Sequence, residues 1–400
     1  MPHTAMPVAR FFDAWVRLSV SKNKILLLSS VIDTERELWS ALEYYSEVEE
    51  VGLNLIQTKG LQPQSLHREI FKYFQAFVRQ AKSYYVSAKA LHYRSNSLLY
   101  YYSFLNLIKA YLLLRDPQKI MGRTTQAVTH GLSYRSTTNN TDFQLEVIRV
   151  SSGIFPMFYE AQTSNVISTA RNSTLSIINL LNYPSDISYQ YQLAGYGNHK
   201  ILPSISAAVT DRTTNQSWTI IGIQELNSIN GFLSLHTNFL NSYQEVSIDY
   251  NRISSVFEMS PLELSYCRFF QDITTIPIVD ETIAMHIHRE TLNLLREKLI
   301  NALTPYFSFH YFDDNKDFDL ILPYQDTTNP TPIPINEALS IYAVMFYLSS
   351  LVRYRPDYLE SLLNYKPAWL IENFVNATPE TFLRIMVCKI IEKDFVFRQR

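Results

Sequence analysis

The segment GRTTQAVTHGL places Arg123 seven positions before His130, and these two residue types can do chemistry together. A histidine, whose ordinary pKa is about 6.5, can take up and return a proton near neutral pH. An arginine beside it can hold a phosphate group and stabilise the charge that develops there. The pair is therefore typical of an RNA-cleaving site. It is also typical of two hydrogen-bonded core residues, with Gly131 ending a helix.

A strongly apolar segment precedes this pair and predicts a helix over residues 98–114. Ser103, Asn106 and Lys109 are its polar exceptions, and their spacing by three places them in one row with Tyr102 beside it. A helix that is apolar nearly all round is usually buried, and an unpaired polar group there costs about 1–3 kcal/mol. The connection to His130 is short, so the Arg123–His130 segment can fold back along this helix. If that pair cleaves RNA, we expect these four side chains to contact a phosphate or a 2′-hydroxyl group. In the alternative interpretation they are hydrogen-bonded core residues.

The segment LSSLVRYRPDYL near the end of the chain carries Arg353 and Arg355 at the end of a second apolar helix, just before Pro356. Cations at this position are favoured by the helix dipole, so capping alone can explain both arginines. In the alternative interpretation, Arg353 contributes a phosphate contact to the site formed around His130. Both interpretations remain open at this level.

Three regions of the chain differ in residue composition and periodicity. Residues 1–182 show mainly helical periodicity, and residues 335–400 return to it after the proline-rich segment TTNPTPIPI. Residues 183–334 contain β-branched and aromatic runs bounded by Asn, Asp, Ser and Pro, which predict strands. We expect the first and last regions to pack into one helical body, with the middle region as a mixed α/β module inserted between them.

Individual elements within these regions can also be predicted. Thr34, Asn336 and Thr378 are expected to cap the N-termini of helices, the last with Pro379 at the first helical position. In the middle region the predicted strands are SWTIIGIQEL, SLHTNFL, YQEVSIDY and DFDLILPY. The one predicted helix of this region is ETLNLLREKLINAL.

Composition bounds the class of protein. Hydrophobic residues make up 46% of the 400 positions and charged residues 18%, which is typical of a folded chain, and the 9 glycines favour helices over tight turns. The net charge of −2 gives no global basic field of the kind that attracts nucleic acid or membranes. No apolar run approaches the ~20 residues of a membrane span, and no signal peptide is indicated. We expect a cytoplasmic protein that does not enter a membrane.

Metal and cofactor motifs do not emerge from the sequence. Cys267 and Cys388 match no metal spacing and no disulfide framework. His286 and His288 lack neighbouring ligands, and the acidic segment DDNKDFDLILPY lacks the Gly and Glu of a calcium loop. We therefore expect no metal and no cofactor.

The blocks YYSFLNLIKA, HGL and LSSLVRYRP lie in this order and far apart in the chain. In these blocks the sequence resembles the YaaC-like family of bacterial proteins. The resemblance extends over most of the chain and implies its fold.

A wider similarity is to HEPN domains, which are helical bundles with a tyrosine-rich helix followed by a histidine-bearing segment. Active members are metal-independent ribonucleases with an R-x(4–6)-H motif, often completed across a dimer. Arg123 and His130 enclose six residues, while Thr124 stands where many active members carry Asn, His or Asp. The resemblance implies catalytic roles for Arg123 and His130, and a toxin or phage-defence context.

These observations predict an α+β protein, mainly α, with a HEPN-like helical bundle. The first functional hypothesis is a metal-independent ribonuclease that acts as a homodimer. The alternative is a catalytically inactive protein that binds RNA, a nucleotide or a partner protein from the same operon. A third hypothesis is an enzyme of another class whose site lies in residues 183–334.

Overall fold

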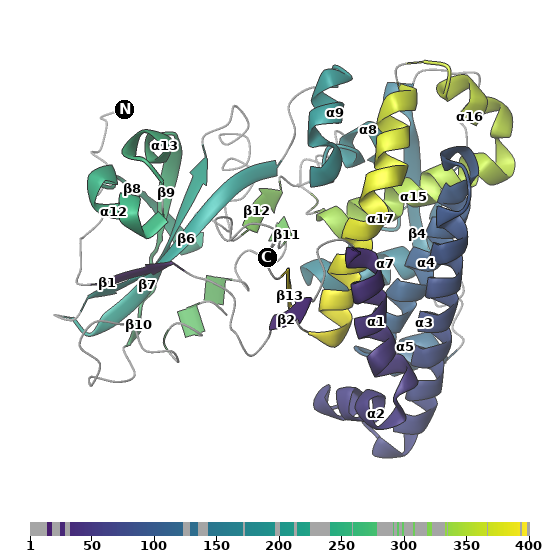
Figure 1. The fold of residues 1–400 in the computed structure, drawn as a ribbon, viewed down its shortest axis with the longest axis horizontal. Helices are drawn as coiled ribbons and strands as arrows, with labels where there is room; N and C mark the ends of the chain where they lie inside the picture. The colour runs from purple at the N-terminus through teal and green to yellow at the C-terminus, as the bar shows by residue number, and fades with distance from the viewer. Residues whose placement is uncertain are drawn as a thin grey trace. The chain divides into compact units, whose positions relative to one another are not determined.

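The computed structural model describes most of the chain as two compact units (Figure 1). The helical unit comprises Leu26–His199 and Tyr324–Arg400, and the sheet unit comprises Met1–Ile25 and Lys200–Pro323. The described residues are 14–17, 25–28, 33–122, 129–134, 143–170, 173–196, 201–211, 214–224, 241–257, 259–277, 291, 294–295, 298–299, 307–308, 318–321, 333, 335–365, 367–392 and 394–397. The chain is an α+β protein and mainly α-helical.

The helical unit is built from long helices near both ends of the described chain, with shorter ones between them (Figure 1). Its α-helices are α1 (Thr34–Glu47), α2 (Glu49–Thr58), α3 (His67–Lys89), α4 (Tyr93–Leu113), α5 (Pro117–Met121), α7 (Ile154–Thr163), α8 (Ile177–Leu180), α9 (Ser188–Leu193), α15 (Glu337–Tyr354), α16 (Pro356–Leu362) and α17 (Pro367–Ile391). Short 3₁₀ turns lie at Gln64–Leu66, Phe143–Leu145 and Ser185–Ile187.

Helix α4 is the core of this unit, because α3, α15 and α17 all pack against it. Its side chains are buried on nearly every face, as the apolar sequence predicted, and those of Tyr101, Phe104 and Leu107 are fully inaccessible. Phe104 stacks on Phe382 of α17, with the ring centroids 4.0 Å apart. Segments from both ends of the chain therefore share one hydrophobic core.

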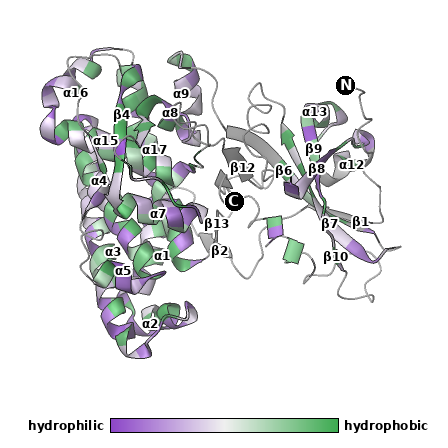
Figure 2. Cartoon of the chain, turned by 180° about the vertical axis from the view of Figure 1, so that it is seen from behind, coloured by the Kyte–Doolittle hydropathy of each residue, from purple (hydrophilic) through white to green (hydrophobic). Residues whose placement is uncertain are grey.

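The helices α1 and α3 are amphipathic and cover this core. Both carry hydrophobic and hydrophilic residues side by side in Figure 2, as one buried face requires. The predicted cap at Thr34 is displaced by one residue. Asp33 caps α1 instead, its carboxylate accepting a hydrogen bond from the backbone N–H of Arg36 at 3.1 Å.

Helices α15 and α17 give one confirmed and one wrong prediction. Asn336 caps α15, because its side-chain oxygen accepts from the N–H of Leu339 at 3.0 Å. Thr378 does not start a helix: α17 runs unbroken through it, with Pro379 inside. The Thr378 hydroxyl donates to the carbonyl of Phe374 at 2.7 Å, a bond one turn back along the same helix.

A small antiparallel sheet interrupts the helical pattern predicted for residues 1–182. Strands β3 (His130–Ser133), β4 (Val147–Gly153) and β5 (Thr174–Ser176) form it in that order. Gly131 therefore belongs to a strand and does not end a helix. A further pair joins β2 (Ile25–Leu28) to β13 (Asp394–Phe397).

The sheet unit consists of antiparallel strands in the order β11-β12-β6-β7-β9-β8, with β1 on β6 and β10 on β7. The strands are β1 (Ala14–Arg17), β6 (Ile201–Asp211), β7 (Gln216–Gln224), β8 (Tyr243–Val246), β9 (Cys267–Asp272), β10 (Ile276–Pro277), β11 (Phe307–Ser308) and β12 (Phe318–Ile321). Two helices, α12 (Tyr250–Phe257) and α13 (Pro261–Ser265), contribute apolar residues to one hydrophobic cluster with β6, β7 and β9.

Three of the predicted strands are confirmed as β7, β8 and β12. The segment SLHTNFL, the histidines His286 and His288, and most of the acidic segment DDNKDFDLILPY lie outside the described residues. Across the part of the chain that is described, the helices fall short of the length and hydrophobicity that crossing a bilayer demands.

Candidate functional site

His130 begins strand β3, where its backbone pairs with Gly153 of β4. The register shifts between His130 and Leu132, so the strand is irregular at Gly131, whose φ is +76°. A Cβ atom at Gly131 would lie 2.6 Å from Pro156 Cδ and 2.7 Å from the backbone nitrogen of Phe155. Glycine is needed after the histidine for both reasons, and the tight packing fixes the backbone that carries His130.

A buried hydroxyl holds the imidazole of His130. The phenolic oxygen of Tyr101, on α4, lies 2.6 Å from His130 Nδ1. The same oxygen lies 3.4 Å from the hydroxyl of Tyr342, on α15. Both tyrosines are fully inaccessible, whereas His130 is half-buried. The site thus joins a strand and two helices through one chain of polar contacts.

Aromatic rings pack around this contact. Tyr101 stacks on Tyr342, with centroids 5.6 Å apart and planes inclined by 23°. Phe346, one turn further along α15, meets the edge of Tyr101 at 5.5 Å and lies 6.1 Å from the His130 ring. The imidazole therefore lies against an apolar aromatic wall, which lowers the local polarity.

Arg353 brings a cation to the same group of rings from the end of α15. Its guanidinium carbon lies 5.9 Å from the ring centroid of Tyr101, 5.8 Å from that of Tyr102 and 5.1 Å from that of Tyr354. It donates to the Tyr102 hydroxyl and to the carbonyl of Ser349, each at 3.3 Å. No carboxylate of the described residues forms an ion pair with it.

Lys109 is a second cation without an acidic partner among the residues that the structure describes. It lies on α4, half-buried, with its ammonium nitrogen 5.9 Å from the ring centroid of Phe77 on α3. Burial lowers the pKa of the Lys109 ammonium group. Two partly desolvated cations thus belong to this side of α4 and α15.

The pKa of His130 is lowered, first because the ring is partly buried and then because Arg353 and Lys109 place positive charge near it. A lowered pKa keeps the imidazole neutral at neutral pH, when it can accept a proton. A negative ligand beside the two cations would reverse part of that effect. The electrostatics of the site therefore favour an anion.

The predicted polar row on α4 has mixed surroundings. Ser103 is fully buried and its hydroxyl donates to the carbonyl of Ala81 on α3 at 2.8 Å. The side-chain amide of Asn106 donates to the carbonyl of Tyr102 at 2.8 Å. The donors of both side chains are therefore used by the protein's own backbone. Tyr102 contacts Arg353, and Lys109 acts on His130 through its charge.

Arg123 lies outside the described residues, in the gap at 123–128, so the described arginine of the site is Arg353. Sequence reasoning missed Tyr101, Tyr342 and Phe346. A signal for two of them was present, because Tyr342, Phe346 and Arg353 recur at helical spacing on α15. Nothing local distinguished Tyr101 from the neighbouring tyrosines of α4.

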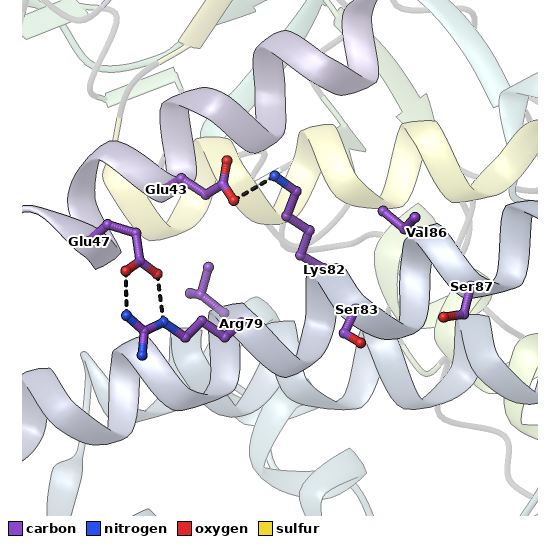
Figure 3. A pocket seen from close by; sticks show the side chains of 8 residues that line it. Glu43, Glu47, Arg79, Lys82, Ser83, Val86 and Ser87 are labelled. Carbon is purple, nitrogen blue, oxygen red and sulfur yellow. Dashed lines mark hydrogen bonds and ion pairs between the residues drawn. The ribbon is translucent and has the colours of Figure 1, made fainter.

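A second feature of the helical unit is a groove of about 460 Å³ between α1 and α3. Figure 3 shows its charged side chains paired with one another, Glu43 with Lys82 at 2.5 Å and Glu47 with Arg79 at 2.5 Å. These pairs are partly exposed and leave no net charge to attract a ligand. The groove is therefore a weaker candidate than the site around His130.

Within the described ranges, no three His, Cys, Asp or Glu side chains come together in a way that could hold a metal ion.

The fold and the site define a mainly helical α+β protein with a histidine held between aromatic rings and two cations. The family model described as YaaC-like Protein matches residues 54–390, and the chain belongs to this family. The match includes every described residue of the His130 site. Comparison with curated proteins returned no match, and comparison with solved structures returned none.

Proposed function

We propose that this protein binds RNA at the His130 site and cleaves it as a metal-independent ribonuclease. The observation that carries the proposal is the position of His130 in the field of Arg353 and Lys109, which have no carboxylate partner among the described residues. Unpaired, partly buried cations are costly unless an anion binds beside them. A phosphodiester is an anion whose cleavage requires proton transfer, which a neutral histidine can perform.

The proposed reaction uses His130 twice. The imidazole first accepts the proton of the RNA 2′-hydroxyl, while the 2′-oxygen forms a bond to phosphorus. The bond from phosphorus to the 5′-oxygen then breaks, and the protonated imidazole returns its proton to that oxygen. The products are a 2′,3′-cyclic phosphate and a free 5′-hydroxyl, so protons and electrons balance. Arg353 would stabilise the negative charge on the phosphoryl oxygens.

Arg123 has a proposed role as well. Its separation from His130 is similar to the R-x(4–6)-H spacing of HEPN ribonucleases, in which the arginine contacts the scissile phosphate. In the proposal Arg123 and Arg353 both contact phosphate groups of the RNA. Because HEPN sites are often completed across a dimer, a homodimer measured by light scattering would support this part, and a strict monomer would contradict it.

The test compares wild type with His130→Ala on mixed RNA in the presence of EDTA. We expect cleavage by wild type and a loss of about 10²–10⁴-fold in the variant, the range for a general acid–base residue. His67→Ala is the matched control, because His67 is also half-buried and makes one ring-nitrogen contact, 2.8 Å from the carbonyl of Leu61. Absence of cleavage by wild type, or equal cleavage by all three proteins, would refute the proposal.

A second candidate function is binding of RNA or a nucleotide without catalysis. It is favoured by the arrangement of Arg353 over three tyrosine rings, one of which, Tyr354, is 69% exposed. Exposed aromatic rings and arginine planes are surfaces on which nucleobases stack. Fluorescence anisotropy with labelled RNA distinguishes the two candidates, since this one predicts binding that Arg353→Gln weakens and no cleavage.

A further inference from the structure

The hydroxyl of Tyr101 contacts one of the two ring nitrogens of His130. Tyr101 reaches His130 Nδ1 from α4 at 2.6 Å, which is shorter than most nitrogen–oxygen hydrogen bonds. No other hydrogen bond joins the imidazole to any residue that the structure describes. Nδ1 is therefore engaged inside the protein, and Nε2 is the nitrogen left for a ligand.

The Tyr101 hydroxyl is itself held in place. Its ring lies between Tyr342, at 5.6 Å, and Phe346, at 5.5 Å, and its side chain is fully inaccessible. The Tyr342 hydroxyl, 3.4 Å away, supplies a second polar neighbour in the same buried space. A buried ring packed against two others cannot change rotamer without opening a cavity, so the position of the hydroxyl is fixed.

We propose that Tyr101 is the positioning residue that fixes the ring orientation and the tautomer of His130, its oxygen accepting from Nδ1–H while its own proton is donated to the Tyr342 hydroxyl. Rotation of the imidazole by a half-turn would break the 2.6 Å contact and leave the buried Tyr101 hydroxyl with only its longer contact to Tyr342, at a cost in free energy. With the proton on Nδ1, Nε2 of the neutral imidazole carries none and can accept one. The assignment of a reaction to that nitrogen rests on the proposed function; the positioning itself does not.

The hydrogen-bond partner of His130 Nδ1 is the neutral hydroxyl of Tyr101. Burial raises the pKa of both Tyr101 and Tyr342 well above the ordinary value, so neither becomes an anion at accessible pH. A carboxylate in the same place would stabilise the imidazolium form of the histidine. The tyrosine pair restrains the ring without adding negative charge, so the protonation of His130 depends on its burial, on Arg353 and Lys109, and on the charge of a bound ligand.

The test measures the imidazole directly by ¹H–¹⁵N NMR of wild type, Tyr101→Phe and Tyr342→Phe. In wild type we expect one tautomer, with well-separated nitrogen shifts. Tyr101→Phe should make these shifts converge, because it releases Nδ1 and lets the tautomers mix. Tyr342→Phe should cause a smaller change of the same kind, since its contact is longer. It also serves as the second variant should Tyr101→Phe fold poorly.

Tyr100→Phe is the matched control, because Tyr100 lies on the same helix, is also buried, and has no hydrogen bond to its hydroxyl among the described residues. It should leave the His130 signals unchanged. If Tyr101→Phe also leaves them unchanged while its melting temperature matches that of the control, the positioning role is refuted.

Activity provides an independent readout. If the proposed ribonuclease is active, Tyr101→Phe should lower kcat about tenfold with little change in KM, as loss of a group that orients a reacting histidine does. An equal loss in Tyr100→Phe would count against a positioning role. If wild type does not cleave RNA, the ribonuclease proposal fails, and the NMR result still decides whether Tyr101 positions His130.

Discussion

The guanidinium group of Arg353 lies over the ring of Tyr102, with Nη1 3.3 Å from the tyrosine hydroxyl and the central carbon 5.8 Å from the ring centroid. This contact connects the end of α15 to the middle of α4. It fixes a cation with a neutral partner, so the positive charge is held in place without being cancelled. That is the electrostatic condition for an anion site.

Removing this charge should change both ligand affinity and the titration of His130. For Arg353→Gln we expect the pKa of His130 to rise toward 6.5, because a neighbouring positive charge is lost. Affinity for a short RNA should fall about 10–100-fold, since one charge-assisted hydrogen bond is worth about 1.5–3 kcal/mol. NMR titration of His130 and fluorescence anisotropy check the two effects.

Arg355→Gln is the control for that substitution. Arg355 is two positions away but bonds Asp357 through two contacts of 3.2 Å each. We expect neither the His130 pKa nor the affinity to change with it. Equal effects of the two substitutions would mean that net charge alone, and not the position of Arg353, controls the site.

The lowered pKa of His130 predicts a pH-dependent contribution to stability. Between this lowered value and 6.5 the unfolded chain binds more protons than the folded one, so the free energy of unfolding falls as the pH decreases through that window. The contribution is fully present above pH 6.5. The stability of wild type relative to His130→Gln should therefore decrease from about pH 7.5 to about pH 5.5. Urea unfolding of both proteins measures their free energies of unfolding. A wild type that becomes more stable relative to His130→Gln as the pH falls would contradict the prediction.

Gly131→Ala should destabilise the protein by about 1–3 kcal/mol, the usual cost of strain at a special backbone position. Two effects combine there: a positive φ, and a Cβ that would lie within 2.7 Å of the Phe155 backbone nitrogen. Gly60→Ala is the matched control, with a similar φ of +66° and open space around the Cβ. Thermal unfolding should show the larger loss for Gly131→Ala. Equal losses would show that the packing of β3 against α7 tolerates a methyl group.

Substitutions along α4 should separate residues that contact the ligand from those that hold the helix. Ser103→Ala removes a fully buried hydroxyl bonded to Ala81, so it should lower stability by about 1 kcal/mol and leave RNA affinity unchanged. Tyr102→Phe removes the hydroxyl that accepts from Arg353 and should weaken RNA binding several-fold. Anisotropy and thermal unfolding measured on both variants test this. Weaker RNA binding by Ser103→Ala would instead support the phosphate contact that the sequence predicted for Ser103.

Much of the helical body could be predicted from local pattern. Runs of consecutive residues indicated α4, the cap at Asn336 and three strands of the sheet unit. Pro379 was misleading because its local signal is that of a helix start, while the packing of α17 holds one continuous helix through it. At Pro379, tertiary packing therefore outweighs the local preference for a helix start.

The site could be predicted only in part. His130 and Arg353 were indicated by residue type and spacing, but their relationship depends on the folding of β3 against α4 and α15. Tyr101 could not be chosen from the sequence YYY, because which of three adjacent rings faces the histidine is set by the orientation of the helix. The same geometry turns Ser103 toward α3 and gives its hydroxyl to Ala81.

The site also has an order of assembly that follows from the chain itself. Tyr102 and Arg353 are 251 positions apart, and Tyr101 and Tyr342 are 241 positions apart. During synthesis on the ribosome, His130 and α4 emerge long before α15, and residues 200–323 of the sheet unit are made in between. A growing chain therefore has the histidine without Arg353 until α15 has left the exit tunnel, so translation itself delays completion of the site until most of the protein has been made.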